Sequence, residues 1–184
     1  DFAVNVSAVK TAIDNRTKII ILANPNSPTG TITPKSDILE LAYSGIPLLV
    51  DEAYYEFCGE TVAPLANQNK NMMVLRTFSK WAGLAGLRIG YGIFPPQIAD
   101  YLLKIKLPYN VSMAASVAVQ ESLVDIDYLM STVKAINTER ERLFSKLKQL
   151  KFLKPFPSRA NFILCSVLEG TASELQQRLQ RKGI

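Results

Sequence analysis

The chain has 184 residues and a net charge of +5, with 48% hydrophobic and 20% charged residues. This balance is typical of a globular protein, and the length suits one substantial domain or the core of one domain with part of a second domain. No apolar stretch is long enough to span a bilayer. The charge does not indicate a nucleic-acid partner, because the densest basic segment, residues 139–154, interleaves acids and leucines at helical spacing and carries no recognition motif.

The sequence has no histidine and two cysteines, Cys58 and Cys165. Without histidine, the commonest general base, the commonest zinc ligand and every Ser-His or Cys-His nucleophile are excluded. Two cysteines are too few for a disulfide scaffold and are not spaced like a metal site, which predicts a reducing compartment, the cytoplasm. Any chemistry must therefore use Lys, Tyr, Asp, Glu or a cofactor.

Both ends of the chain have the character of cut ends. The first residue is Asp rather than Met, and no basic segment leads into an apolar run as in a secretory signal. The last residues, QRLQRKGI, stop directly after a helical pattern, where a strand is expected to follow. We expect a fragment that lacks residues at both ends.

Strand and helix patterns alternate along the first half of the chain. The predicted strands are residues 18–23, 46–54, 72–80 and 86–94. The predicted helices begin at Ser7, at Pro34 (to residue 42) and at Pro96 (to residue 106). This alternation predicts an α/β fold with a mostly parallel sheet flanked by helices.

The second half changes character after residue 112. A helical pattern runs from Met113 to about Leu150 with a break near residues 125–127, and a strand (161–167) and a helix (171–182) follow. We expect residues 1–124 to belong to a large domain and residues 125–184 to a smaller α+β domain.

Polar residues follow three of the predicted strands, in residues 24–30, 51–54 and 77–80. Ligands of open α/β sheets bind at the carboxyl ends of the strands, so these loops are expected to form one site. Most lysines are solvated surface groups, but Lys80 lies between apolar residues, and a desolvated amine can form a Schiff base. Thr77, Ser79 and Arg88 supply the hydroxyls and the guanidinium that hold a phosphate dianion. An amine beside a phosphate site fits pyridoxal phosphate.

Asp51 ends an apolar strand, where an ionised carboxylate needs a cationic partner. That partner is either a structural ion pair or the protonated pyridine nitrogen of the cofactor, which such a carboxylate turns into an electron sink. Tyr54 is placed to donate to the phenolic oxygen of the cofactor. A nucleotide site is disfavoured, because the glycines at 83, 86, 90 and 92 form neither a P-loop nor a dinucleotide-binding motif.

The ordered motifs NPNSPTG (24–30), DEAYYEF (51–57) and RTFSKWAGLAGLRIGYG (76–92) resemble the class I/II aminotransferases of pyridoxal-phosphate fold type I, and within them the histidinol-phosphate aminotransferase subfamily. The likeness runs essentially end to end. It implies that residues 1–124 are part of the cofactor-binding large domain, and that Lys80 is both the Schiff-base lysine and the proton-shift catalyst. It also implies that Asp51 pairs with the pyridine nitrogen and that Tyr54 contacts the phenolic oxygen. The residues implied to bind the phosphate are Thr77, Ser79 and Arg88.

The resemblance also implies an Asn directly before Pro-Thr-Gly as a contact to the phenolic oxygen, but this chain has Ser27 there and Asn26 one position earlier. We expect Asn26 to make the contact, with Ser27 as the alternative. Two further segments, LPYNVS (107–112) and ANFIL (160–164), resemble family segments near the bound substrate. They make Tyr109, Asn110 and Asn161 candidate substrate residues.

The activity that the resemblance implies is transamination between histidinol phosphate and 2-oxoglutarate by a homodimer of the full-length protein. The alternatives are another class I/II aminotransferase, a decarboxylase of the same fold, and a non-catalytic domain that kept the fold. The arginine for the substrate carboxylate is expected outside this chain. Arg159 is the internal rival, although its flanking PFPS segment is typical of an exposed turn.

Overall fold

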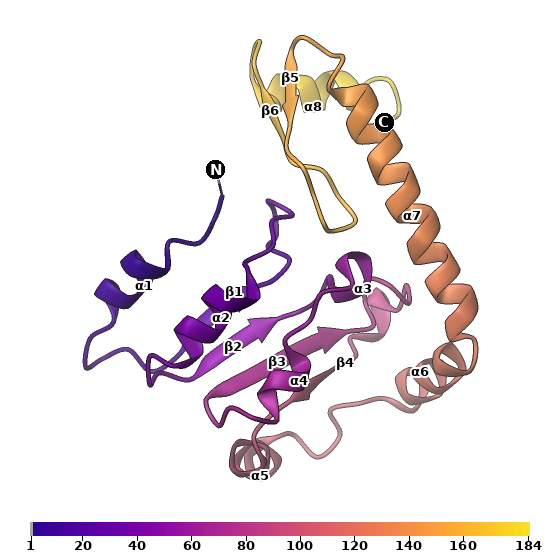
Figure 1. Ribbon diagram of the computed structural model, residues 1–184. Coiled ribbons are helices and arrows are strands. Elements are labelled where there is room, and N and C mark those ends of the chain that lie inside the picture. The colour runs from indigo at the N-terminus through magenta and orange to yellow at the C-terminus, as the bar shows by residue number, and fades with distance from the viewer. Residues whose placement is uncertain (1) are drawn as a thin grey trace.

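A computed structural model describes residues 2–184, and its main sheet has four strands in the order β1-β2-β3-β4 (Figure 1). The strands β1 (Ile20–Ala23), β2 (Leu48–Asp51) and β3 (Met72–Thr77) are parallel, and β4 (Gly90–Ile93) runs antiparallel to β3. The predicted α/β fold with a mostly parallel sheet is confirmed. The strands are rich in Ile, Leu, Val and Met because this sheet is buried against helices.

The main core lies between the sheet and the helices α2 (Lys35–Ala42) and α4 (Ala63–Ala66). Its fully buried side chains include Ile38 and Leu41 of α2 and alternate residues of β2 and β3, where successive side chains face opposite sides of the sheet. The short helix α1 (Val6–Ala12) packs on α2, as the pattern from Ser7 predicts, and Lys10 pairs with Glu40 at 2.8 Å.

The register of the parallel strands brings their carboxyl ends to one edge. Ala23 is opposite Asp51, which is opposite Leu75. The chain continues this alignment beyond the strands, because the Asn24 amide donates to the Asp51 carbonyl at 2.8 Å and the Glu52 amide to the Leu75 carbonyl at 2.9 Å. The loops that follow β1, β2 and β3 therefore start side by side.

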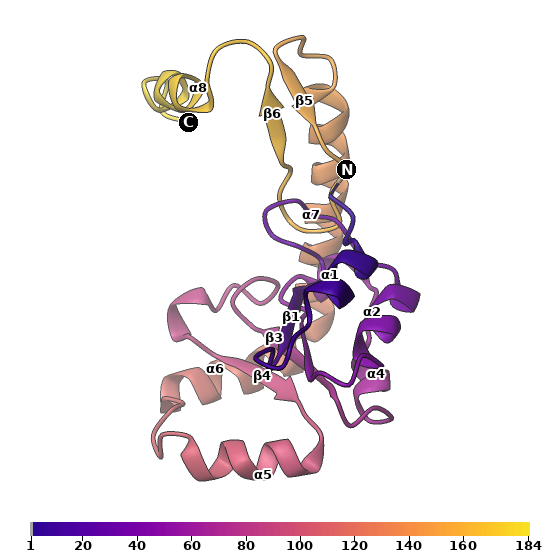
Figure 2. The same ribbon diagram turned by 90° about the vertical axis from the view of Figure 1, so that its left-hand side faces the viewer.

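The second half of the chain contains the long helix α7, which leads away from the sheet to a small β-hairpin (Figures 1 and 2). After α3 (Tyr55–Cys58), the 3-10 turn η1 (Ala85–Leu87) and α5 (Pro96–Ile105), helix α6 (Met113–Val124) leads into α7 (Ile126–Leu147). Helix α7 runs from α6 past α3 to the hairpin of β5 (Leu153–Pro155) and β6 (Cys165–Val167), which is followed by α8 (Ala172–Gln180). Within residues 2–184, no helix is both long and apolar enough to cross a membrane.

All five predicted strands are shorter than expected, and in two of them the difference changes the local structure. Residues 86–94 were expected to form one strand, but η1 and Arg88, which has a left-handed φ of 53°, precede β4. The strand expected over 161–167 begins only at Cys165, and its partner β5 lies in a segment for which no strand was expected. A three-residue strand with Pro at one end carries too little alternation to be recognised without its partner.

Candidate active site

The amine of Lys80 and the ring of Tyr54 meet at the carboxyl end of the sheet. The Nζ atom lies 5.4 Å from the centroid of the Tyr54 ring, within the range of a cation-π contact. Lys80 follows β3, and Tyr54 caps the N-terminus of α3 after β2. The side chain of Lys80 is exposed in this chain, so the desolvated surroundings expected from its apolar neighbours are not formed by residues 2–184.

Asp51, the last residue of β2, is partly buried and forms no ion pair with any lysine or arginine among residues 2–184. One carboxylate oxygen, Oδ1, accepts a hydrogen bond from the Ala53 amide at 3.0 Å. The structural ion pair considered for this carboxylate is thus not made by the described part of the chain, and the group remains available for a cation.

Of the three residues expected at a phosphate group, Thr77 ends β3, and Ser79 and Arg88 lie between β3 and β4. The Thr77 hydroxyl accepts from the Ser79 amide at 3.0 Å and lies 3.4 Å from the Ile89 carbonyl. Arg88 is exposed, and its guanidinium donates to the Ala85 carbonyl at 3.0 Å. No carboxylate of residues 2–184 pairs with Arg88, so its charge is free for an anion.

The loop NPNSPTG engages Asn26 and leaves Ser27 open. The Asn26 side-chain amide donates to the Thr29 hydroxyl at 2.7 Å, and its backbone bonds to Thr31 and Gly30. Ser27 is exposed, and its hydroxyl has no hydrogen-bond partner within 2–184. Asn26 thus stabilises its own loop with one amide hydrogen, and its second amide hydrogen remains for a ligand.

A segment from the hairpin region joins the site. The Arg159 amide donates to the Gly30 carbonyl at 2.8 Å, and Ser158 and Ala160 on either side of Arg159 are buried. The Phe162 ring meets the Tyr54 ring edge to face, with centroids 5.2 Å apart and an interplanar angle of 87°. The expectation of an exposed turn is therefore wrong for Ser158, which is buried against Gly30, whereas Pro157 and Arg159 are exposed.

The guanidinium of Arg159 is bonded to residues near the end of α3. It pairs with Glu60 at 3.0 Å and donates to the Cys58 carbonyl at 3.1 Å. Asn161 is exposed and directly precedes Phe162, whose ring contacts Tyr54, so it lies beside the site.

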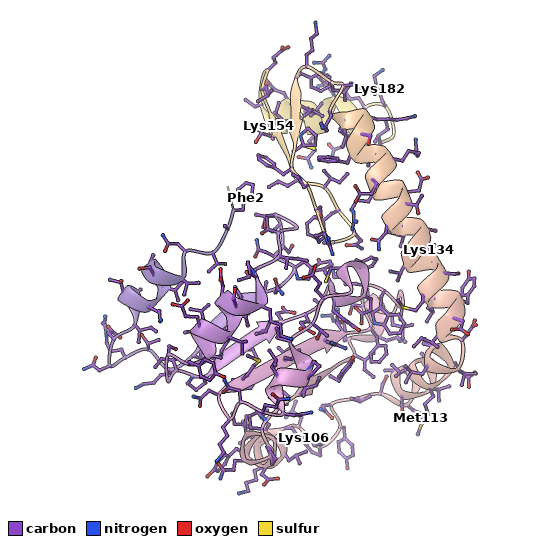
Figure 3. The ribbon with its side chains drawn as sticks, viewed as in Figure 1. Phe2, Lys106, Met113, Lys134, Lys154 and Lys182 are labelled. Atoms are coloured by element: carbon purple, nitrogen blue, oxygen red, sulfur yellow. The ribbon has the colours of Figure 1, made fainter. Side chains whose placement is uncertain are left out.

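Tyr109 and Asn110 are not brought to the site by residues 2–184. Tyr109 is 95% exposed, and Asn110 is also exposed. Figure 3 shows Lys106 and Met113, which bracket their loop, at the opposite end of the molecule from Lys154 of β5. A substrate role for these two residues therefore requires chain beyond the described part.

Sequence reasoning missed the buried ion pair of Glu52 and Arg76, whose guanidinium and carboxylate atoms lie 2.9 Å apart. The signal was present, because Glu52 directly follows a buried strand and Arg76 lies within one, and charged side chains are almost never fully buried unless they are paired.

Glu56 was also not singled out. Burial raises the pKa of its carboxyl from 4.5 to about 7, a shift opposed by its own backbone hydrogen bond and by Arg76. One of its oxygens, Oε2, is buried without a hydrogen-bond partner in the described structure.

Comparison with known proteins places these residues in context. The family model "Aminotransferase class I and II" matches residues 1–184. A curated histidinol-phosphate aminotransferase from Dehalococcoides mccartyi is 51% identical over 183 residues, which are 100% of this chain and 51% of that protein. The chain thus spans about half the length of this relative.

Two solved structures have the same fold. The histidinol-phosphate aminotransferase from Clostridium acetobutylicum has a TM-score of 0.91 and 25% identity, and the match covers 99% of this chain and 57% of that one. The enzyme of the same name from Sinorhizobium meliloti, in complex with pyridoxal-5'-phosphate, has a TM-score of 0.84 and 28% identity over 96% of this chain and 50% of that one.

Proposed function

This chain belongs to the class I and II aminotransferase family, and on that basis we propose a function for the full-length protein. It transfers an amino group between histidinol phosphate and 2-oxoglutarate, with pyridoxal phosphate as its cofactor. The observation that carries the proposal is the contact of an exposed amine, Lys80, with the Tyr54 ring at the edge of the sheet where β2 ends on Asp51. Within residues 2–184 this carboxylate is free of ion pairs. The choice of substrate rests on the name of the relative at 51% identity.

The polar groups at this edge fit the parts of the cofactor. Lys80 is the amine that binds its aldehyde, and Asp51 is the carboxylate that pairs with its pyridine nitrogen. The Tyr54 hydroxyl donates to its phenolic oxygen. The phosphate is held by Thr77, Ser79 and Arg88, which offer two hydroxyls and a free guanidinium. When bound, the cofactor supplies an electron sink for the carbanion formed at the amino acid.

The chain's own contribution is orientation and proton transfer. Asp51 is fixed by the hydrogen bond from Ala53, so its second oxygen remains free for a ring nitrogen. The Lys80 amine would be the base that takes a proton from the α-carbon of the amino acid and returns it during amino transfer. The Tyr54 ring, held by the edge of Phe162, confines the amine on one side.

The remaining assignments are part of the same proposal. Asn26 or Ser27 contacts the phenolic oxygen, and Ser27 has the free hydroxyl. Tyr109, Asn110 and Asn161 line the substrate side when the protein is complete. Residues 1–124 form part of the cofactor-binding domain and residues 125–184 part of the small domain.

We also propose that the full-length protein is a homodimer in the cytoplasm. Large apolar side chains of α5 and the loop after it are left open, with Leu103 60% exposed, Ile105 78% and Leu107 74%, which is typical of a surface that another part of the protein covers. Both cysteines are free, in keeping with a reducing compartment.

The experiment is borohydride reduction of the full-length protein with pyridoxal phosphate, followed by peptide mass mapping. The adduct is expected on Lys80, and an adduct on any other lysine would overturn the site. Absorbance changes with histidinol phosphate and with other amine donors then identify the substrate. Carbon dioxide release would identify a decarboxylase instead, and no change with any donor would favour a non-catalytic domain.

A further inference from the structure

A buried charge network lies behind the candidate site. The Glu52 side chain is 0% exposed, and its carboxylate accepts hydrogen bonds from three residues. They come from the Thr61 hydroxyl at 2.7 and 2.9 Å, the Val62 amide at 2.7 Å, and the Arg76 guanidinium at 2.9 and 3.0 Å. Burial of a charged carboxylate without such partners is strongly unfavourable, so Glu52 stays buried only while these hydrogen bonds are formed.

The network holds the turn that carries the site residues. Glu52 directly follows Asp51, and the Tyr55 amide donates to the Glu52 carbonyl at 3.0 Å. The guanidinium carbon of Arg76 lies 3.6 Å from the centroid of the Tyr55 ring. Asp51 and Tyr54 are therefore each followed by a residue that the Arg76 guanidinium contacts.

Arg76 also connects this turn to the strand that leads to Lys80. It lies in β3, four residues before the lysine, and its backbone is opposite Tyr91 of β4. The same guanidinium bonds the residue after Asp51 and stacks on the residue after Tyr54. It also donates to the Thr61 hydroxyl at 2.7 Å. One side chain of β3 thus contacts the residue after Asp51 and the residue after Tyr54, in addition to the backbone pairing of β2 with β3.

We propose that Glu52 and Arg76 are positioning residues, which hold Asp51 and Tyr54 in register with Lys80 without touching the cofactor themselves. The inference rests on the function proposed above. The inference extends the proposed function, because it assigns the alignment of the site residues to the ion pair of Glu52 and Arg76. Misplacement of a reacting group by about 1 Å can lower a rate about 100-fold, so a network of this kind affects turnover as well as stability.

The test uses Glu52→Gln, Arg76→Met and the double variant in the full-length protein, with Glu40→Gln as the control. Glu40 forms an exposed ion pair with Lys10 at 2.8 Å, so the control makes the same chemical change away from the site. The measurements are the thermal midpoint, kcat and KM, and the visible circular dichroism of the bound cofactor, which reports its orientation.

Arg76→Met is expected to lower the thermal midpoint most, because it leaves Glu52 buried and unpaired, and the double variant is expected to recover much of that loss. If the network positions the site, kcat stays about 10-fold to 100-fold low in the double variant, and the dichroic band stays altered, while the Lys80 adduct still forms. Recovery of kcat and of the band together with the thermal midpoint would overturn the proposal. Failure of the proposed function itself is distinguishable, since the unchanged protein would then give no adduct on Lys80.

Discussion

Replacement of Gly30 by Ala tests whether the loop NPNSPTG and the segment 158–160 act as one unit. Gly30 has a φ of +72°, and a Cβ atom there would overlap the Ser158 side chain. Its carbonyl accepts the hydrogen bond of the Arg159 amide at 2.8 Å. The substitution therefore strains the backbone and also displaces a buried segment that comes from the far end of the chain.

The expected magnitude can be separated into two parts. A left-handed conformation costs a non-glycine residue about 1–2 kcal/mol. Displacement of Ser158 adds the loss of one backbone hydrogen bond, about 1 kcal/mol, and the loss of packing at Ala160, which is 0% exposed. The total loss of unfolding free energy is about 2–4 kcal/mol. Gly45, with a φ of +84° and no atom within 4 Å of a Cβ, should show only the first part when it is changed to Ala.

Urea unfolding, followed by the fluorescence of Trp81, measures both variants. Trp81 is the single tryptophan and is 7% exposed, so its emission reports the packing of the region beside the site. The Gly30 variant is expected to lose clearly more stability than the Gly45 variant, and to be cleaved faster by protease near residues 156–160. Equal losses in the two variants would refute the docking of this segment on the loop.

Three further predictions concern charge and completeness. Burial raises the pKa of Glu56 from 4.5 to about 7. The stability that this group contributes should therefore be fully present below pH 4.5 and be lost as the pH rises to 7. Glu56→Gln should raise the thermal midpoint at pH 8 and leave it unchanged near pH 4. Asp51→Asn should keep the fold but lower kcat about 100-fold to 1,000-fold, because a neutral amide does not hold the ring nitrogen protonated, and wild-type turnover would remove Asp51 from the site. The chain of residues 1–184 alone should form the adduct on Lys80 without amino transfer from histidinol phosphate, and a transfer rate equal to that of the full-length protein would make Arg159→Met the next variant to test.

The position of the candidate site could be predicted because it depends on adjacent parallel strands. Each of the loops after β1, β2 and β3 begins where an apolar run ends on polar residues, and the sequence contains both signals. Once the strands are parallel neighbours, their carboxyl ends lie at the same edge without further information. Lys80 and Tyr54 come from two of these loops and meet at that edge.

The exposure of Lys80 could not be predicted in the same way. The apolar residues on both sides of it in the sequence do not cover it: Trp81 is buried in a cluster with Phe57, Phe78 and Val133, away from solvent, while the amine remains exposed. Neighbours along the chain indicate which segment is buried, but the cover over a particular atom comes from segments distant in sequence.

Arg159 illustrates the same limit for charge. Local sequence places it in a proline-containing segment typical of a turn, but the structure holds its backbone on Gly30 and directs its guanidinium to Glu60, 99 positions away in the chain. An exposed pair of this kind contributes only about 0–1 kcal/mol, so Glu60 by itself does not prevent Arg159 from binding a substrate carboxylate. The fixed backbone is the stronger restriction, because Ser158 and Ala160 are buried on either side and the arginine must reach any new partner from this anchored position. The role of Arg159 in the site is thus decided by the reach of its side chain rather than by the strength of its ion pair.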